Sequence, residues 1–241
     1  MISRIKSMFQ TSEVNQRPKF KQAFFSQDCL LCAVPSGVQM LCTACRTSLP
    51  PIAHACPRCA APSADQICGE CLKHPPAFDH TRAALEYAFP TDKLIQALKY
   101  GGQLALAKLF GELLAEAVAD QARPETILAM PLHPARLKTR GFNQALEIAK
   151  VIAKRRHIAL APDLVQRVVD TTPQASLPID ARHTNVKGAF ACEQDLRGQH
   201  IAVVDDVMTS GATLNELAKI LKRAGAAQVD VWIVARAVTH R

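Results

Sequence analysis

The sequence predicts an α/β protein, in which a mostly parallel sheet is flanked by helices and preceded by a small cysteine-rich domain. From about residue 81, short apolar runs alternate with amphipathic stretches, the pattern of right-handed βαβ units. Before that point, eight cysteines stand in four C-x-x-C pairs among several prolines. We therefore expect a lead-in over residues 1–28, a metal-binding domain over 29–80 and an α/β domain over 81–241.

Composition excludes membrane-embedded and secreted classes. Hydrophobic residues make up 49% and charged residues 21% of the 241 residues, the ordinary mix of a globular chain. No run approaches the roughly 18 consecutive apolar residues of a membrane span, and the polar N-terminus lacks the apolar centre of a signal peptide. We therefore expect a cytoplasmic protein without a membrane span.

The paired cysteines have the spacing of metal ligands. Two intervening residues let one tight turn present both sulfurs to the same ion, whereas disulfide scaffolds spread their cysteines along the chain. Taken in order, the pairs give two four-cysteine sites: Cys29, Cys32, Cys42 and Cys45, then Cys56, Cys59, Cys68 and Cys71. An interleaved pairing, or one site with loose thiols, also fits the gaps. Because an all-cysteine shell leaves no open position, we expect structural Zn²⁺, about two ions per chain. Cys192 is expected to be a free thiol.

The elements of the α/β domain follow from periodicity. Residues 91–100 and 104–119 are expected to be helical, residues 127–132 to form a buried strand, and residues 142–155 to form another helix. A strand over 200–207 precedes an amphipathic helix that Gly225 closes, and a third strand covers 229–234. The connection over 171–188 is long enough to act as a lid.

The strongest chemical signal lies where the strand at 200–207 ends. Two adjacent carboxylates are followed by hydroxyls and a glycine: Asp205, Asp206, Val207, Met208, Thr209, Ser210, Gly211, Ala212 and Thr213. In open α/β sheets ligands bind at this end of the strands, and loop amides with a helix N-terminus form an anion site. The carboxylates, expected at the surface, would repel a phosphate, so they suit ribose hydroxyls or Mg²⁺. The pattern therefore describes a site for a 5-phosphoribosyl group. The alternative is an ordinary βα turn whose hydroxyl side chains cap the following helix. That interpretation explains the hydroxyls but not the two adjacent carboxylates.

This stretch resembles the 5-phosphoribosyl 1-pyrophosphate (PRPP) motif of type I phosphoribosyltransferases. Residues 131–144 read Pro-Leu-His-Pro-Ala-Arg-Leu-Lys-Thr-Arg-Gly-Phe-Asn-Gln, and with the cysteine-rich head they make the chain similar to the ComF/GntX family. Residues 98–101 (Leu-Lys-Tyr-Gly), 172–174 (Thr-Pro-Gln) and 182–190 (Arg-His-Thr-Asn-Val-Lys-Gly-Ala-Phe) also fit the family pattern. The similarity covers residues 29–241. It implies a type I phosphoribosyltransferase-like domain preceded by a double zinc ribbon.

The resemblance also assigns roles to individual residues. Asp205 and Asp206 would hold the ribose of PRPP, which Mg²⁺ accompanies, and would favour the positive charge that develops at the anomeric carbon. In related transferases the loop after the first core strand holds the pyrophosphate. The corresponding cations here, an oxyanion clamp, are Arg136, Lys138 and Arg140. Arg182 and Lys187 fall where those enzymes carry a mobile catalytic loop.

Two classes of function remain. The family acts in DNA uptake during competence and in the use of external DNA as a nutrient, which implies single-stranded DNA and the DNA-uptake helicase machinery as partners. Residues 123–156, with eight basic and two acidic side chains, also point to a polyanion or a pyrophosphate group. The other class is an active PRPP-dependent phosphoribosyltransferase in nucleotide metabolism or salvage. Aromatic residues, which stack on single-stranded bases, make up only 5% of the chain.

Overall fold

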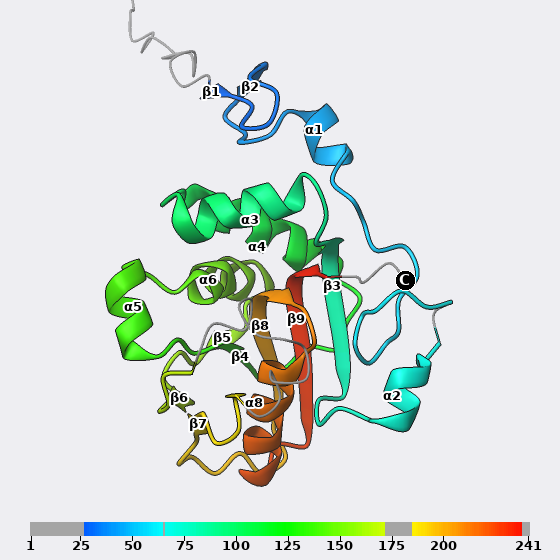
Figure 1. Ribbon diagram of the computed structural model, residues 1–241, viewed down its shortest axis with the longest axis vertical. Helices are drawn as coiled ribbons and strands as arrows, with labels where there is room; N and C mark the ends of the chain where they lie inside the picture. The colour runs from blue at the N-terminus through cyan, green and yellow to red at the C-terminus, as the bar shows by residue number, and fades with distance from the viewer. Residues whose placement is uncertain (1–26, 65, 172–184, 238–241) are drawn as a thin grey trace, which may run out of the picture.

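The computed structural model describes residues 27–64, 66–171 and 185–237, and a five-stranded sheet lies at its centre (Figure 1). The strand order is β3-β9-β8-β4-β5, and all neighbouring strands are parallel. In chain order the strands are β3 (His80–Glu86), β4 (Thr126–Ala129), β5 (Ala159–Leu160), β8 (His200–Met208) and β9 (Gln228–Arg236). The predicted parallel sheet is therefore confirmed.

Helices cover both faces of the sheet. α4 (Ala105–Ala117) and α6 (Gln144–Arg156) pack against each other, α4 over β3 and β9 and α6 over β4 and β8. α8 (Ala212–Arg223) contacts β9 from the other face, because the chain crosses from β8 to β9 in the opposite direction along the sheet and the crossovers are right-handed. α3 (Thr91–Tyr100) contacts α4 on the side away from the sheet (Figure 1).

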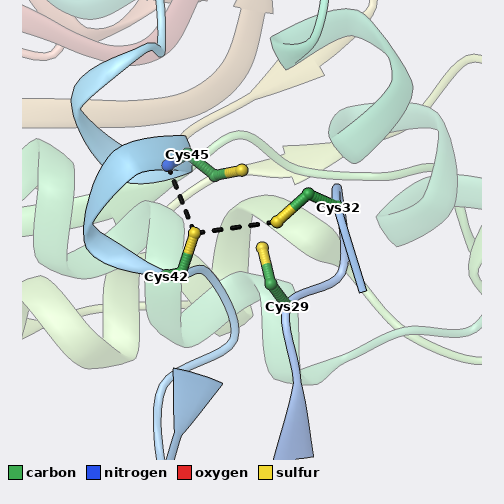
Figure 2. A group of neighbouring side chains, drawn as sticks. All are labelled: Cys29, Cys32, Cys42 and Cys45. Carbon is green, nitrogen blue, oxygen red and sulfur yellow. Dashed lines mark hydrogen bonds between the residues drawn. The ribbon is translucent and has the colours of Figure 1, made fainter. Parts of the chain in front are cut away.

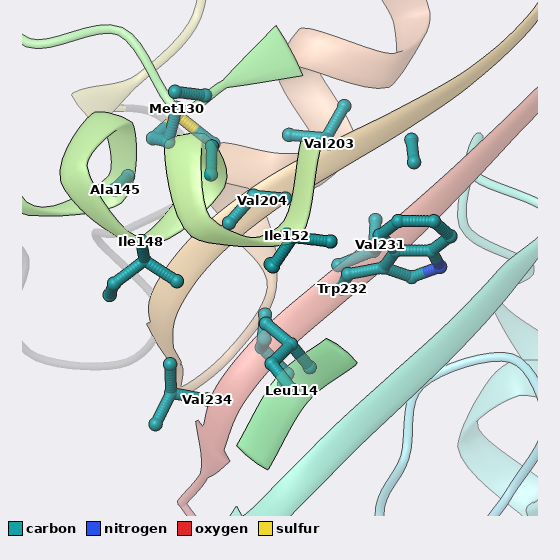
Figure 3. Packing of buried hydrophobic residues seen from close by; sticks show 14 of the residues in the cluster. Leu114, Met130, Ala145, Ile148, Ile152, Val203, Val204, Val231, Trp232 and Val234 are labelled. Carbon is teal, nitrogen blue, oxygen red and sulfur yellow. The ribbon is translucent and has the colours of Figure 1, made fainter. Parts of the chain in front are cut away.

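The apolar core lies between the sheet and the layer of α4 and α6. Figure 3 shows Leu114 of α4 with Ile148 and Ile152 of α6 beside Val204 of β8 and Trp232 of β9. All five side chains are fully buried. Both faces of β8 and β9 are covered, so most residues of these strands are apolar. The two strands could therefore be predicted from the sequence as nearly continuous apolar runs.

The second half of the cysteine-rich region packs along the edge of the sheet at β3, where Pro51 pairs with Leu85. The first half lies beyond α3 (Figure 1), with Arg46 paired to Glu116 of α4 at 3.0 Å. The region contains β1 (Gln27–Asp28), β2 (Pro35–Gly37), α1 (Thr43–Thr47) and α2 (Gly69–Lys73). Its buried residues Leu41, Leu49 and Phe78 belong to the same apolar cluster as the α/β core. The backbone N–H of Thr81 donates to the carbonyl of Pro57 at 2.9 Å. The region therefore shares the α/β core, and the domain boundaries at residues 28 and 80 stay predictions.

A short helix follows β4 where the sequence predicted strand and then loop. β4 ends at Ala129, three residues before the expected end of the strand at 132, and α5 covers Pro134–Arg140. Pro134 occupies the first turn of α5, His133 caps its N-terminus through Nδ1, and Gly141 ends it with φ 83°. The expected loop was therefore wrong, because a proline at N1 and a left-handed glycine after the helix delimit a helical turn even in a short segment.

The sheet reverses its winding direction between β4 and β8. From β4 the chain crosses to β5, and from β8 it crosses the other way to β9, so the connections at the two carboxyl ends diverge. A crevice opens at such a switch point, and ligands of open α/β sheets bind there. A two-stranded ribbon of β6 (Gln166–Arg167) and β7 (Phe190–Ala191) follows β5. Most of the expected lid lies outside the described residues.

Among the described residues, no helix has both the length and the apolar character needed to cross a membrane.

Candidate functional site

A pocket of about 280 Å³ occupies the switch point of the sheet. Its floor is the carboxyl end of β8 with the following loop and the start of α8, and its walls come from the ends of α3 and β4, from α5 and from β6. The pocket contains the whole predicted motif: Asp205, Asp206, Val207, Met208, Thr209, Ser210, Gly211, Ala212 and Thr213. The structure thus places these nine residues around one cavity.

The two carboxylates of the motif occupy different environments. The backbone N–H of Asp206 donates to Oδ1 of Asp205, and the N–H of Val207 donates to Oδ1 of Asp206, both at 2.8 Å. Asp205 is half-buried, but Asp206 is only 4% exposed. The expectation that both carboxylates lie at the surface was therefore wrong for Asp206, because the fully covered strand β8 carries its burial pattern to its last residues.

Lys99 neutralises the buried carboxylate. Its Nζ lies 2.7 Å from Oδ2 of Asp206, and the Lys99 side chain is itself largely buried. In the sequence, Lys99 stands out only as part of residues 98–101, which fit the family pattern. The sequence shows only a lysine in the last turn of a helix whose buried face is largely apolar. Its partner, Asp206, lies more than a hundred residues away in the sequence.

These charges perturb each other's protonation. Burial and the neighbouring Asp206 carboxylate raise the pKa of Asp205 to about 8, although the Lys99 ammonium opposes this rise. Burial disfavours the charge on Lys99, but the Asp206 carboxylate holds the pKa of Lys99 above its ordinary value. At neutral pH the site therefore combines a protonated Asp205 with a Lys99–Asp206 ion pair, and a ligand with hydroxyls can both donate to and accept from it.

The loop after β8 forms an anion cradle. Gly211 is the N-cap residue of α8 with φ 77°, and a Cβ there would lie 2.5 Å from Cε of Met208. Gly211 has no side chain to cap the helix, and the N–H of Ala212, the first residue of α8, donates to Oγ of Ser210 at 3.4 Å, so the helix start lies beside the hydroxyl residues Thr209 and Ser210 that line the pocket. Such a helix start carries a partial positive charge, which suits a phosphate.

The predicted clamp is only partly assembled at the pocket. Arg136 and Arg140 line it, and their guanidinium groups donate to the Thr171 carbonyl and to Oε1 of Gln144 respectively. Lys138, on the same short helix, is exposed and does not line the pocket. A seven-residue helix makes only about two turns, so three alternate residues cannot all face one side.

Lys187, one of the two residues expected on a mobile catalytic loop, does not line the pocket. It is exposed and lies beside Glu216 and Lys219 of α8. Arg182 lies outside the described residues. Instead, the pocket contains Arg167 of β6, which is 7% exposed and for which the sequence analysis gave no prediction. Burial and the nearby Arg136 lower the pKa of Arg167, whose Nε has no hydrogen-bond partner among the residues that the structure describes.

The basic stretch of residues 123–156 divides between two ends of the sheet. Gln144, at the start of α6, lines the pocket, whereas Arg155 lies eleven residues farther along the helix, about 16 Å away. Arg155 pairs with Glu112 at 3.2 Å and Lys150 pairs with Glu147 at 2.8 Å. These side chains therefore form surface pairs on helices, and only the α5 arginines of this stretch belong to the pocket.

The eight paired cysteines form two groups in chain order. Figure 2 shows Cys29, Cys32, Cys42 and Cys45 with their sulfurs converging, and the second group is Cys56, Cys59, Cys68 and Cys71. Within each group all Sγ atoms lie within 4.8 Å of one another. The sequential pairing is therefore the one the structure contains, and Cys192 belongs to neither group.

Both groups have the dimensions of a tetrahedral zinc shell. The Sγ atoms of Cys32 and Cys42, and those of Cys59 and Cys68, are 3.7 Å apart. Sulfurs at the corners of a tetrahedron with Zn–S bonds of about 2.3 Å lie roughly 3.8 Å apart, whereas a disulfide would need about 2 Å. The residues present therefore fit structural zinc.

The two groups are built by the same local design. The residue after each first pair, Ala33 or Ala60, adopts positive φ and donates its N–H to the carbonyl of Cys29 or Cys56, at 2.8 Å in both cases. Each second pair begins at the N-cap of a short helix, α1 or α2, where the helix dipole favours thiolates. Burial opposes ionisation of Cys29 and Cys56, but backbone N–H groups lower their pKa values to about 6 and about 7.

Comparison with known proteins identifies the family of the chain. The family model for the phosphoribosyl transferase domain matches residues 138–240. The DNA utilization protein YhgH of Escherichia coli K12 is 33% identical over 218 residues, which cover 86% of this chain and 96% of that protein. The chain belongs to the ComF/GntX family. Competence protein F of Haemophilus influenzae is 32% identical, with 89% of this chain and 99% of that protein covered.

A more distant ComF/GntX relative is competence protein ComFC of Streptococcus pneumoniae, 24% identical over 81% of this chain and 87% of that protein. Among solved structures, a purine phosphoribosyltransferase from Pyrococcus horikoshii is 18% identical, covers 55% of this chain and 74% of its own, and has a TM-score of 0.34. The fold predicted from the sequence is confirmed: a phosphoribosyltransferase-type parallel sheet with flanking helices, joined to two four-cysteine groups.

Proposed function

We propose that this ComF/GntX protein binds PRPP or a related phosphoribosyl group at the switch-point pocket and acts on incoming single-stranded DNA. The observation that carries the proposal is the convergence of the acidic pair, the hydroxyl loop and two arginines on one cavity. Zinc at the two four-cysteine groups is part of the proposal as a structural cofactor.

Each part of the pocket suits a different part of such a ligand. Thr209, Ser210 and the start of α8 offer donors for the 5′-phosphate. Asp205 and Asp206 suit the two ribose hydroxyls, since a carboxylate accepts hydrogen bonds and Asp205 in its protonated form also donates one. Donors rather than acceptors line the phosphate end, so each ligand group meets the charge it needs.

The pyrophosphate of PRPP suits the opposite wall of the pocket. Arg136 and Arg140 present planar guanidinium groups that can each bind phosphate oxygens in pairs. When bound, Mg²⁺ would neutralise part of the pyrophosphate charge. The ion pair of Lys99 and Asp206 adds no net charge to the floor of the pocket.

The DNA part of the proposal rests on the relatives. Their names refer to DNA utilization and competence, and they match this chain over most of its length. In this proposal the protein works in the cytoplasm beside the helicase machinery of DNA uptake, and the phosphate pocket also serves the sugar–phosphate backbone.

An active transferase is the second candidate. The acidic pair is positioned on a ribose-sized pocket, and carboxylates there would favour positive charge at an anomeric carbon. The two candidates differ in products: an enzyme releases pyrophosphate from PRPP when a nucleobase acceptor is present, and a binding protein does not.

Calorimetric titration with PRPP and Mg²⁺, and separately with short single-stranded DNA, tests the proposal. We expect both ligands to bind and PRPP to compete with DNA. Binding of PRPP without any binding of DNA, together with pyrophosphate release in the presence of an acceptor base, would favour the enzyme instead.

A further inference from the structure

A second, larger groove opens beside the phosphoribosyl pocket. It has a volume of about 770 Å³ and lies between the end of α3 and the helix α5. The two cavities share Lys99, Tyr100, Arg136 and Arg140, so a single ligand can extend from one into the other. Neither the acidic pair nor the hydroxyl loop reaches this groove, and the proposed phosphoribosyl site leaves it unexplained.

Tyr100 gives the groove an open aromatic surface. It is the last residue of α3, and its side chain is 76% exposed although Lys99 and Leu98 beside it are mostly buried. The guanidinium of Arg140 lies 5.6 Å from the centre of the Tyr100 ring. The two planar groups therefore form a cation–π pair at the junction of the two cavities.

The remaining lining is cationic and partly apolar. Arg136 and Lys99 face the groove from opposite sides, and Phe142 adds a half-buried aromatic ring. Among the described residues of the lining, the one carboxylate belongs to Asp170, which lies 3.6 Å from Nε of Arg136. A ligand that fits this lining carries negative charge near the arginines and a flat apolar group near Tyr100.

We infer that this groove is a base-stacking subsite for a nucleotide of single-stranded DNA, with Tyr100 as the stacking platform. The inference rests on the proposed function and deepens it. A base stacks on Tyr100 while its phosphate lies between Arg136 and Arg140. Stacking on aromatic rings beside cations is how proteins bind single strands without reading their sequence.

The exposure of Tyr100 favours a DNA strand over a free nucleobase. Pockets for small molecules bury about 70–90% of the ligand surface, but a platform that is 76% exposed leaves one side of the base open. An open side lets the neighbouring nucleotides of a strand enter and leave the groove.

Fluorescence anisotropy on the full zinc-loaded protein tests the inference. Two labelled oligonucleotides of equal length are compared, an oligo-dT and an abasic strand. Both strands carry the same phosphates, so the difference in affinity between them measures the contribution of the bases to binding. We expect the wild-type protein to prefer oligo-dT by at least about tenfold. Tyr100→Ala removes this preference, and Tyr100→Phe keeps it because the ring remains.

Phe89→Ala is the matched control, since Phe89 is equally exposed at 77% but lines neither cavity. Thermal unfolding of each variant verifies the fold. A Tyr100→Ala protein that keeps the full preference for oligo-dT, or a wild-type protein that binds both strands equally, would overturn the subsite alone. A wild-type protein that binds neither strand would overturn the DNA part of the proposed function as well.

Discussion

Arg236 donates a hydrogen bond from Nε to the carbonyl oxygen of Cys59, at 2.9 Å. Its Nη1 also donates to the carbonyl of Met208 at 3.0 Å and to that of Thr209. One side chain at the end of β9 thus joins the second four-cysteine group to the loop of the phosphate cradle. The metal-binding region and the proposed ligand site are mechanically connected, although the sequence separates them by more than a hundred residues.

Replacing Arg236 should weaken ligand binding without loss of zinc. In Arg236→Met the carbonyls of Met208 and Thr209 lose the guanidinium donor, although Met208 keeps its bond from the Ala237 N–H, and the cradle loop becomes less well fixed. We expect the PRPP affinity to fall about tenfold, since a hydrogen bond to a charged group contributes about 1.5–3 kcal/mol. Elemental analysis should still find the full zinc content. Arg197→Met, at an exposed arginine paired only with Asp195 in the part of the chain described here, is the control.

Removal of zinc should unfold the cysteine-rich region first. The eight thiolates in two tetrahedral groups predict about two zinc ions per chain, and without them residues 29–80 lose the bonds that hold their turns. We expect chelation to abolish protection from hydrogen exchange in this region while the parallel sheet remains protected. Cys32→Ser and Cys59→Ser should each lose one ion, and Cys192→Ser should lose none. A single zinc ion in the wild-type protein would contradict the two-site structure.

The stability of the protein should depend on pH through Asp205. Its pKa is raised to about 8 in the folded protein, above the value of an unfolded aspartate. The folded state therefore holds this proton more tightly. The resulting stabilisation is complete below the unfolded pKa and is lost as pH rises through about 8. We expect Asp205→Asn, which cannot ionise, to gain stability relative to the wild type as pH increases, with the gain levelling off above pH 8.

Urea denaturation over a pH series measures this difference. A stability difference between wild type and Asp205→Asn that does not vary with pH would show that Asp205 titrates normally.

Replacing either arginine of α5 should weaken ligand binding more than replacing Lys138, which lies between them in the sequence. Arg136 and Arg140 line the pocket, whereas Lys138 is exposed outside it. Alanine at either arginine should weaken both PRPP and single-stranded DNA. Lys138→Ala should leave PRPP affinity unchanged. Each lost contact with a DNA phosphate should also reduce the slope of log K against log salt by about 0.7. Equal effects at all three positions would mean that these side chains act only as general positive charge.

The sequence predicted those parts of the fold that local patterns determine. The expected helix over 91–100 matches α3, and the strand at 200–207 matches β8 to within one residue. These segments have periodic or continuous apolar patterns that cover their whole length. β3 was missed because most side chains of His80–Glu86 are small or polar, so the segment has no clear apolar pattern. It becomes recognisable as a strand only through its pairing with β9.

The site was predictable where its residues are adjacent in sequence and not where tertiary contacts assemble it. The acidic pair and the hydroxyl loop form one contiguous motif. Lys99 and Arg167, by contrast, enter the pocket from α3 and β6, and no local pattern connects them with β8. The ion pair between Lys99 and Asp206 was missed for the same reason.

The central claim is that the switch-point pocket binds a phosphoribosyl ligand through the acidic pair. Asp205→Asn is the variant of choice, because Asp206→Asn would leave the buried Lys99 ammonium without its partner and destabilise the protein. The most direct test is calorimetric titration of the zinc-loaded protein with PRPP and Mg²⁺, at a pH above the Asp205 pKa of about 8. We predict one PRPP bound per wild-type chain and no measurable binding by a folded Asp205→Asn protein. Absence of PRPP binding by the wild type, or equal affinity in the two proteins, would contradict the claim.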